Sequence, residues 1–536
     1  MSRGMVCAAQ PEAAEAGADI LRAGGNVVDA AIGAALVQTA VDPQMCGIAG
    51  MGTMQLYLPA RSIHTTIDFH ARAPFATQPD MWQELILREA DDGWGFILRG
   101  RVNELGYQSV GTPMTLRAFD VILRRFGTRP IAELLQPAIE YCEEGFLIRP
   151  HVSEFWHLPP RAGRDANIDI ISRFPATRKI YTKNGGMFYA TGEMLRNPDM
   201  GRTYRRIAQY GADDFYTGEI AHRIVRDMAK HSGLLSQDDL ASCTPEESPP
   251  LFGSYRSFRI ATNNPPGGGI QLIEMLNILE QFDLAAMGHN SPEYIRVVSE
   301  AMKIATVDKD TSIGDPRFVH VPVNKLTSKD YAARMAERIR RHEKTDVPRL
   351  NTGGRESSHT THICVMDPMG NAATMTHTLG QPSGVVTEGL GFMYNGAMSV
   401  FDPRAGYAGS LAPGKARFSA MSPTIVFKRN TPFLVLGAPG ATYITMGNLQ
   451  AMLNVMEFGM DARQSVSEPR FAAVSDRIEL SNRILRSAER ALQTMGYATQ
   501  RHAKSYEFAR VHAIRCVNGG LDGGADPNGG GMALSV

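Results

Sequence analysis

Cysteine pairs, long apolar runs and an excess of either charge are all missing from this sequence of 536 residues. The 6 cysteines are scattered, and no two of them form a Cys-x-x-Cys motif, which disfavours both a disulfide framework and a zinc site. The 55 basic residues are balanced by 55 acidic residues. A net charge of zero creates no field that would attract a polyanion, so we expect no nucleic-acid partner.

Membrane-spanning and export signals are also missing. The longest helical apolar run, residues 30–41, is well short of the roughly 20 residues that a spanning helix needs. The first residues, MSRGMVCAAQ, lack the basic start, apolar run and small-residue cleavage site of a secretory signal. These absences predict a cytoplasmic protein without a membrane partner.

Familiar cofactor and metal motifs do not occur in a usable context. There is no Gly-x-x-x-x-Gly-Lys-Ser/Thr loop, which disfavours P-loop chemistry. The glycine-rich stretch 47–52 follows a predicted helix and precedes a predicted strand, which is the wrong order for a dinucleotide-binding fold. His359 and His362 are three residues apart, but further zinc ligands are lacking nearby. We therefore expect neither a metal nor a cofactor.

Glycine is abundant instead, with 52 residues, which indicates many tight turns and close backbone approaches. Residues 335–356 are charged and polar, and we predict a solvated, mobile segment there. A helix-rich larger part precedes this segment and a strand-rich smaller part follows it, which favours a layered fold around mainly antiparallel sheets. The predicted helices cover residues 11–23, 30–41, 112–126, 270–281, 291–308 and 446–456, and the main predicted strands cover 54–57, 63–69, 258–262, 360–366, 372–379, 424–428 and 433–436.

The start of the predicted strand at Thr360 could carry chemistry. A threonine hydroxyl is a weak nucleophile, but cleavage of the chain just before it frees an α-amine that can act as its base. Such an amine titrates near 8 in reference peptides, so a fair fraction is neutral near pH 7. The polar segment before Thr360 fits this requirement. The pattern alone nevertheless favours ordinary strand threonines, which are common.

Many motifs, in one order along nearly the whole chain, resemble the gamma-glutamyltransferase family of N-terminal nucleophile (Ntn) hydrolases. They are GGNVVDAA at 24–31, GTP at 111–113, PPGGG at 265–269, LNILE at 276–280, EAMK at 300–303, GDP at 314–316, TTH at 360–362, the stretch from Asp367 through GNA at 370–372, MSPTIV at 421–426, GAPG at 437–440, PRF at 469–471 and ADP at 525–527.

The resemblance implies an α+β fold, a four-layer αββα sandwich, made as a precursor that cleaves itself between His359 and Thr360. Residues 1–359, which end in the flexible segment, would form a large subunit and residues 360–536 a small one, together making one structural domain. The two fragments would remain associated with each other, and a homodimer of such heterodimers is left open. The resemblance implies no cofactor.

The resemblance also assigns catalytic roles. Thr360 would be the nucleophile and its freed amine the base. Thr378 would hydrogen-bond the nucleophile, and the strand alternation of Thr374, Thr376 and Thr378 places all three on one face. Gly440 and Ala441 match the paired glycines whose backbone N–H groups form the oxyanion hole, and alanine keeps its N–H.

Departures from the family pattern fall on the substrate-binding positions. His70 stands where the family has an arginine that holds the substrate α-carboxylate, and a neutral imidazole cannot replace a bidentate guanidinium. Arg72, two residues on, points to the same face if the strand continues, and could supply a displaced clamp or be a solvated rim residue.

Further substrate-binding positions have lost polar groups. Gly380 stands where the family has an asparagine. Val400 stands where the family has an acidic residue that pairs with the substrate amine. Asn395 is kept, but glycine follows it where the family has glutamine. Ser419 and Ala420 match a pair of serines of which only the first remains. Loss of several charge-assisted contacts should weaken binding of a zwitterionic head group many-fold.

We therefore expect a self-processing, Thr360-dependent amidohydrolase that forms an acyl-enzyme on a small amide other than a standard γ-glutamyl compound. One alternative is a true γ-glutamyl hydrolase or transferase of glutathione-like substrates, with a clamp rebuilt from Arg72 and Arg417. Another is an unprocessed, non-catalytic family member with a binding role. Whether water or an amine accepts the acyl group is left open.

Overall fold

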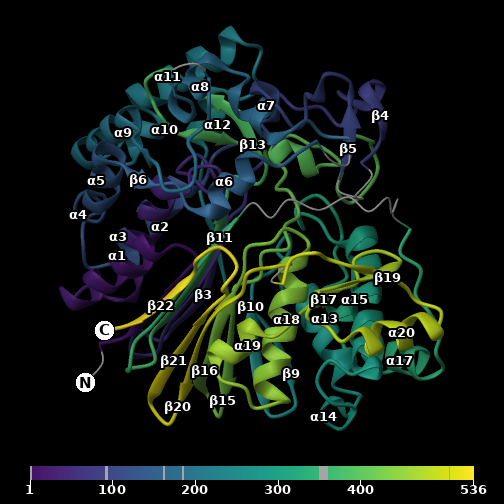
Figure 1. The fold of residues 1–536 in the computed structure, drawn as a ribbon. Helices are drawn as coiled ribbons and strands as arrows, with labels where there is room; N and C mark the ends of the chain where they lie inside the picture. Colours follow the sequence, from purple (N-terminus) through teal and green to yellow (C-terminus); the bar gives the residue numbers. More distant parts are fainter. Residues whose placement is uncertain (1–2, 91–94, 161–162, 184–185, 349–359, 506–507) are drawn as a thin grey trace.

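Two antiparallel sheets, stacked face to face, form the centre of the molecule in a computed structural model that describes residues 3–90, 95–160, 163–183, 186–348, 360–505 and 508–536 (Figure 1). The first sheet has the order β22 (Met532–Ser535), β1 (Met5–Ala8), β11 (Thr361–Met366), β12 (Ala372–Thr378), β2 (Met51–Leu58), β3 (Ile63–Phe69) and β8 (Glu246–Ser248). The second has the order β21 (Gly520–Ala525), β20 (His512–Val517), β16 (Thr431–Gly437), β15 (Thr424–Lys428), β10 (Phe258–Thr262) and β9 (Leu251–Tyr255).

Helices cover the outer face of each sheet, so the fold is the predicted four-layer αββα sandwich (Figure 1). The buried helix α2 (Val27–Val41) packs on β11 and β12, which explains why its sequence is almost free of charge. Around it lie α1 (Pro11–Arg22), α3 (Thr115–Phe126), α5 (Gln136–Glu144) and α9 (Pro198–Tyr210). The second sheet is covered by α13 (Gly269–Leu279), α15 (Pro292–Ser312), α17 (Lys329–Arg340) and α18 (Tyr443–Met456).

Shorter elements surround this sandwich. The helices are α4 (Ile131–Leu134), α6 (Pro150–Trp156), α7 (Asn167–Ser172), α8 (Pro175–Tyr181), α10 (Asp213–Tyr216), α11 (Glu219–Lys230), α12 (Gln237–Ala241), α14 (Leu284–Met287), α16 (Val323–Leu326), α19 (Ala462–Ser467) and α20 (Arg486–Thr494). The strands are β4 (Ile86–Glu89), β5 (Phe96–Leu98), β6 (Phe146–Leu147), β7 (Met194–Leu195), β13 (Pro382–Val386), β14 (Met393–Asn395), β17 (Phe471–Ala472), β18 (Arg477–Leu480) and β19 (Ala498–Arg501).

Each sheet contains strands from the part of the chain before Thr360 and strands from the part after it. In the first sheet β11 pairs with β1 and β12 pairs with β2, and in the second β10 pairs with β15. A chain cut before Thr360 would therefore keep its two parts joined by backbone hydrogen bonds and a shared core.

The prediction of a mobile segment at residues 335–356 is wrong for its first residues. Helix α17 continues to Arg340, because Ala336 and Ile339 are buried against the neighbouring helices while the charged residues face outward. The many charged residues on that outer face made the helical spacing of the apolar residues hard to recognise in the sequence. Residues 349–359 of the segment lie outside the described residues.

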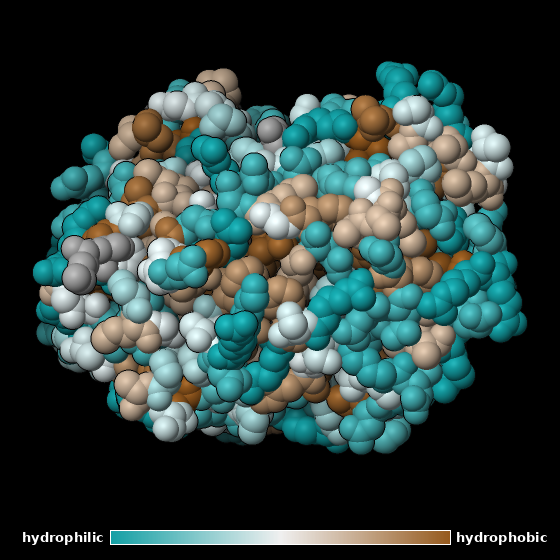
Figure 2. Space-filling view, turned by 90° about the horizontal axis from the view of Figure 1, so that it is seen from below, coloured by the Kyte–Doolittle hydropathy of each residue, from teal (hydrophilic) through white to brown (hydrophobic). Residues whose placement is uncertain are grey.

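Figure 2 shows one face, on which hydrophilic residues surround smaller hydrophobic areas near its centre. Within the described part of the chain, none of the helices combines the length and the apolar character needed to cross a bilayer.

Buried histidines predict loss of stability in acid. Burial lowers the pKa of His377 and of His512 to about 3, so both are neutral in the folded protein. The unfolded chain takes up these protons below about pH 6.5 and the folded chain does not, so stability falls as the pH drops from 6.5 toward 3. We expect each histidine to lower the free energy of unfolding by about 2 kcal/mol at pH 5.

The difference in thermal unfolding midpoint between pH 7.5 and pH 5 measures this effect. His377→Gln should reduce that difference, since glutamine can still reach its partner Gln38 but takes up no proton. His222→Gln, at an exposed position, is the matched control and should keep the wild-type difference. Equal differences in both variants would show that these histidines do not carry the acid sensitivity.

Candidate active site

Thr360 stands immediately before β11 and is buried, with 4% of its surface exposed. The antiparallel register pairs Thr361 with His377, so the next pair along places Thr360 opposite Thr378. The Thr360 hydroxyl donates to Oγ1 of Thr378 over 3.2 Å. The same Thr378 oxygen accepts the backbone N–H of Gly380 at 2.8 Å. The structure thus brings together the two threonines that the sequence predicts to be partners.

The polar row predicted on β12 continues inward from this pair. Thr376 and Thr374 contact the two ring nitrogens of His362 on β11, with Oγ1–N distances of 2.8 and 3.0 Å. Burial lowers the pKa of His362 well below its ordinary value, so the ring is neutral. These contacts join β11 to β12 just beyond the pair of Thr360 and Thr378, which lie at the ends of these two central strands.

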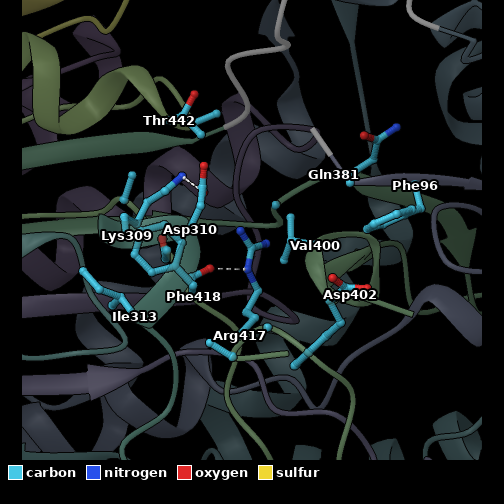
Figure 3. A pocket seen from close by; sticks show the side chains of 18 of the residues that line it. Phe96, Lys309, Asp310, Ile313, Gln381, Val400, Asp402, Arg417, Phe418 and Thr442 are labelled. Carbon is cyan, nitrogen blue, oxygen red and sulfur yellow. Dashed lines mark hydrogen bonds and ion pairs between the residues drawn. The ribbon is translucent and has the colours of Figure 1, made fainter. Parts of the chain in front are cut away.

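Thr360 and Thr378 line a cavity of about 580 Å³. Figure 3 shows other residues of its wall. The other predicted site residues on its wall are Gly380, Ser419, Ala420 and Ala441. Together with Thr360 and Thr378 they come from four separate parts of the chain, and the sandwich gathers them at one end of its two sheets. Further wall residues include Phe96, Lys309, Asp310, Ile313, Gln381, Val400, Asp402, Arg417, Phe418 and Thr442.

The turn at Gly440 and Ala441 leads into α18. Ala441 has the left-handed φ of 51° and lines the cavity, whereas Gly440, with a φ of 143°, is not one of the residues that line it. A Cβ at position 440 would come within 2.6 Å of Cα of Ala509, so only glycine fits there. A turn at a helix N-terminus suits an anionic oxygen. Its role as an oxyanion hole stays a prediction.

Three predicted substrate-binding residues do not lie on the cavity wall. His70 is buried, with Nδ1 2.5 Å from a carboxylate oxygen of Asp68. The Arg72 guanidinium pairs with Glu246 at 2.6 Å. It is therefore engaged in a rim ion pair and does not form the displaced clamp that its position in the strand suggested.

The Asn395 side chain hydrogen-bonds to backbone groups and does not line the cavity. Its amide nitrogen donates to the carbonyls of Ala49 and Gly111 at 2.8 and 2.9 Å. Its amide oxygen accepts the N–H groups of Gly111 and Ala397 at 3.0 and 3.1 Å. With these bonds made, the side chain fixes the loop around it. His359, the predicted residue before the cut, lies outside the described residues.

Arg417 is the wall residue whose importance the sequence left least clear. It is buried, and burial lowers the pKa of its guanidinium to about 9. The signal available in the sequence was its position four residues before the MSPTIV motif, inside the stretch that supplies Ser419 and Ala420.

Replacement of Thr378 should weaken catalysis without preventing folding. Thr378→Val removes the acceptor of the Thr360 hydroxyl and leaves the Gly380 N–H without its partner, whereas Thr378→Ser keeps the oxygen. From the usual cost of such a loss, about 1–3 kcal/mol, we expect a roughly 5- to 150-fold lower kcat/KM for the valine variant. Amide hydrolysis by the two variants measures this. Equal rates would show that the hydrogen bond has no catalytic role.

The αββα sandwich with a threonine hydroxyl at the start of a central strand defines an enzyme of the Ntn-hydrolase class. The family model described as gamma-glutamyltranspeptidase matches residues 13–536, and the chain belongs to this family.

Individual relatives fall under two activities. The Acylase ACY 1 proenzyme of Pseudomonas sp. strain V22 is 35% identical over 506 residues, which cover 93% of this chain and 88% of that protein. The Glutathione hydrolase proenzyme of Escherichia coli strain K12 is 31% identical over 485 residues, which cover 88% and 80%. The crystal structure of cephalosporin acylase from Bacillus halodurans matches with a TM-score of 0.86 and 25% identity, over 99% of this chain and 96% of that chain.

Proposed function

We propose that this chain is a self-processing amidohydrolase in which Thr360, freed by cleavage after His359, attacks a small amide that is not a standard γ-glutamyl compound. The observation that carries the proposal is the hydrogen bond of 3.2 Å from Thr360 to Thr378 at the wall of the cavity. The acylase and the glutathione hydrolase among its relatives are both named as proenzymes, which supports the cleavage step.

The chemistry proceeds in two halves. Oγ1 of Thr360 bonds to the amide carbon while its proton passes to the freed α-amine. The carbonyl oxygen becomes an anion, for which the turn at Gly440 and Ala441 is placed, and collapse of this intermediate releases the amine with the transferred proton. Water then attacks the ester by the same route and releases the acid, which restores Thr360.

The altered specificity rests on the wall of the cavity. Val400 stands at the position of the family's acidic residue, and its apolar side chain faces the cavity (Figure 3). Position 380 has no side chain, and His70 lies away from the wall. A γ-glutamyl α-ammonium group would lose its charge-assisted contact at position 400, which supports a substrate without that group. Cytoplasmic location and pairing of heterodimers stay predictions.

An acyl anilide panel tests the proposal. Purified protein that has been cut before Thr360 should release p-nitroaniline from simple acyl anilides with a kcat/KM at least about 10-fold above that for the γ-glutamyl anilide, because a missing polar contact discriminates strongly. Preferential turnover of the γ-glutamyl anilide would instead support the γ-glutamyl hydrolase or transferase, for which Arg417 would be the carboxylate clamp. A chain that stays intact would contradict both enzymes.

A further inference from the structure

Gln38 is a fully buried polar residue on the otherwise apolar helix α2. Its Nε2 donates to Oγ1 of Thr361 at 2.8 Å and to Oε1 of Gln10 at 2.6 Å. Its Oε1 accepts the Nε2–H of His377 at 2.8 Å. A buried amide destabilises the fold unless it is hydrogen-bonded, so these contacts explain how the helix accommodates Gln38. They also connect this helix to both central strands of the first sheet.

Thr361 and His377 are the neighbours of the two threonines in the candidate active site. In the register of β11 and β12 they lie opposite each other, one residue from the pair of Thr360 and Thr378. Side chains alternate along a strand, so Thr361 and His377 face α2, while Thr360 and Thr378 face the other side of the sheet. Gln38 therefore bridges the ends of the two strands from behind the nucleophile.

The side chain of Gln10 holds the other edge of β11 at the same level. Strand β1 pairs with β11 as far as Ala8 and Ile363. Just beyond this pair, Oε1 of Gln10 accepts the hydroxyl of Thr361 at 3.2 Å, and its Nε2 donates to Asp42 at 2.6 Å. The Thr361 hydroxyl thus has hydrogen bonds with two side chains that precede the proposed cleavage site.

Cleavage before Thr360 would turn the start of β11 into a chain terminus. Terminal residues are poorly ordered unless contacts hold them in place. The freed Thr360 would be connected to the fold along the chain through Thr361 alone. Misplacement of a reacting group by about 1 Å can cost about 100-fold in rate. The processed enzyme therefore needs contacts that fix the second residue of its smaller fragment.

We propose that Gln38 is a positioning residue, which holds Thr361 and His377 together and thereby keeps the freed Thr360 opposite Thr378. The inference rests on the proposed function, because it requires cleavage before Thr360 and a reaction at its hydroxyl. Gln38 lies on the opposite side of the sheet from that hydroxyl, so its effect on the reaction passes through the backbone of Thr361.

Hydrogen exchange tests the inference without any turnover. Deuterium uptake by residues 361–366 of the processed protein should be at least about 10-fold faster in Gln38→Leu and in Thr361→Val than in wild type, because each variant loses a contact that holds the strand end. Thr361→Ser keeps the hydroxyl and should behave as wild type. Thr39→Val is the matched control, since Thr39 is also buried on α2 but its hydroxyl contacts Tyr204. Unchanged uptake in Gln38→Leu and Thr361→Val, or an equal increase in Thr39→Val, would overturn the inference.

Turnover tests the same role in the reaction. Processed Gln38→Leu and Thr361→Val should lose about 10- to 100-fold in kcat on acyl anilides, with KM within about 3-fold of wild type, because the nucleophile is displaced while the cavity is unchanged. Thr361→Ser should keep most of the wild-type kcat. A raised KM with unchanged kcat, or an equal loss in Thr39→Val, would overturn the inference.

Two further outcomes separate this inference from the proposed function. A folded Thr361→Val chain that is not cut would show that the hydroxyl acts before cleavage, which would also overturn the inference. Processed wild type that hydrolyses no amide would count against the proposed function, while the exchange measurement would still decide whether Gln38 holds the new terminus.

Discussion

Thr360→Ala should yield a single intact chain that hydrolyses no amide. The substitution removes the hydroxyl that attacks both the peptide bond before residue 360 and the substrate, so the expected loss of activity is at least about 1,000-fold. Thr378 keeps its bond from the Gly380 N–H, so the fold should persist. Gel electrophoresis and intact mass would show one chain of 536 residues, whereas wild type would give fragments 1–359 and 360–536.

Thr360→Ser is the control for this result, because it keeps a hydroxyl and, after cleavage, an α-amine at the same position. We expect it to be cut and to be active, at a reduced rate. Circular dichroism would verify that both variants are folded. Two fragments from Thr360→Ala, or turnover at the wild-type rate, would remove Thr360 from the mechanism.

Gly440→Ala should be the next most damaging change. The added Cβ would meet Cα of Ala509 at 2.6 Å, and the φ of 143° disfavours any side chain. The turn must then shift, and with it the N–H groups that we predict to bind the developing oxyanion. Removal of one oxyanion donor typically costs about 100- to 1,000-fold in kcat, and we expect a loss in this range. The kcat of the processed variant measures it.

Ala441→Gly is the control at the same turn, because it changes a side chain without displacing the backbone. Glycine keeps the N–H and relaxes a φ of 51° that alanine adopts only with strain, so activity should stay within a few-fold of wild type. If Gly440→Ala were as active as Ala441→Gly, the turn before α18 would not be the oxyanion site.

The sequence predicts the residues around the nucleophile better than it predicts the residues that bind the substrate. Strand alternation and the hairpin between β11 and β12 suffice to bring Thr360 to Thr378, because register in a tight hairpin is fixed by its turn. The αββα layers came from the family resemblance, since neither strand periodicity nor composition specifies which strands become neighbours across 300 or more residues, as β1 and β11 do.

The substrate end depends on contacts that no local pattern reveals. Arg72 was a reasonable substitute clamp on strand alternation, but its partner Glu246 lies far away in the chain on the neighbouring strand β8. Asn395 looked like a substrate contact and instead holds two loop carbonyls. The sequence suggested Arg417 as part of a rebuilt clamp, but its burial and its closeness to position 380 became visible only in the fold. In each case a long-range contact decides the role.

The central claim is that Thr360 becomes an N-terminal nucleophile that carries the acyl group. The most direct measurement is the intact mass and peptide map of the smaller fragment, taken after rapid acid quench of a reaction with an acyl anilide that the processed protein hydrolyses. The account predicts a fragment that begins at Thr360 and carries one acyl group from that substrate on the same residue, which hydroxylamine removes. A fragment with another first residue, or an acyl group located on a different side chain, would contradict it.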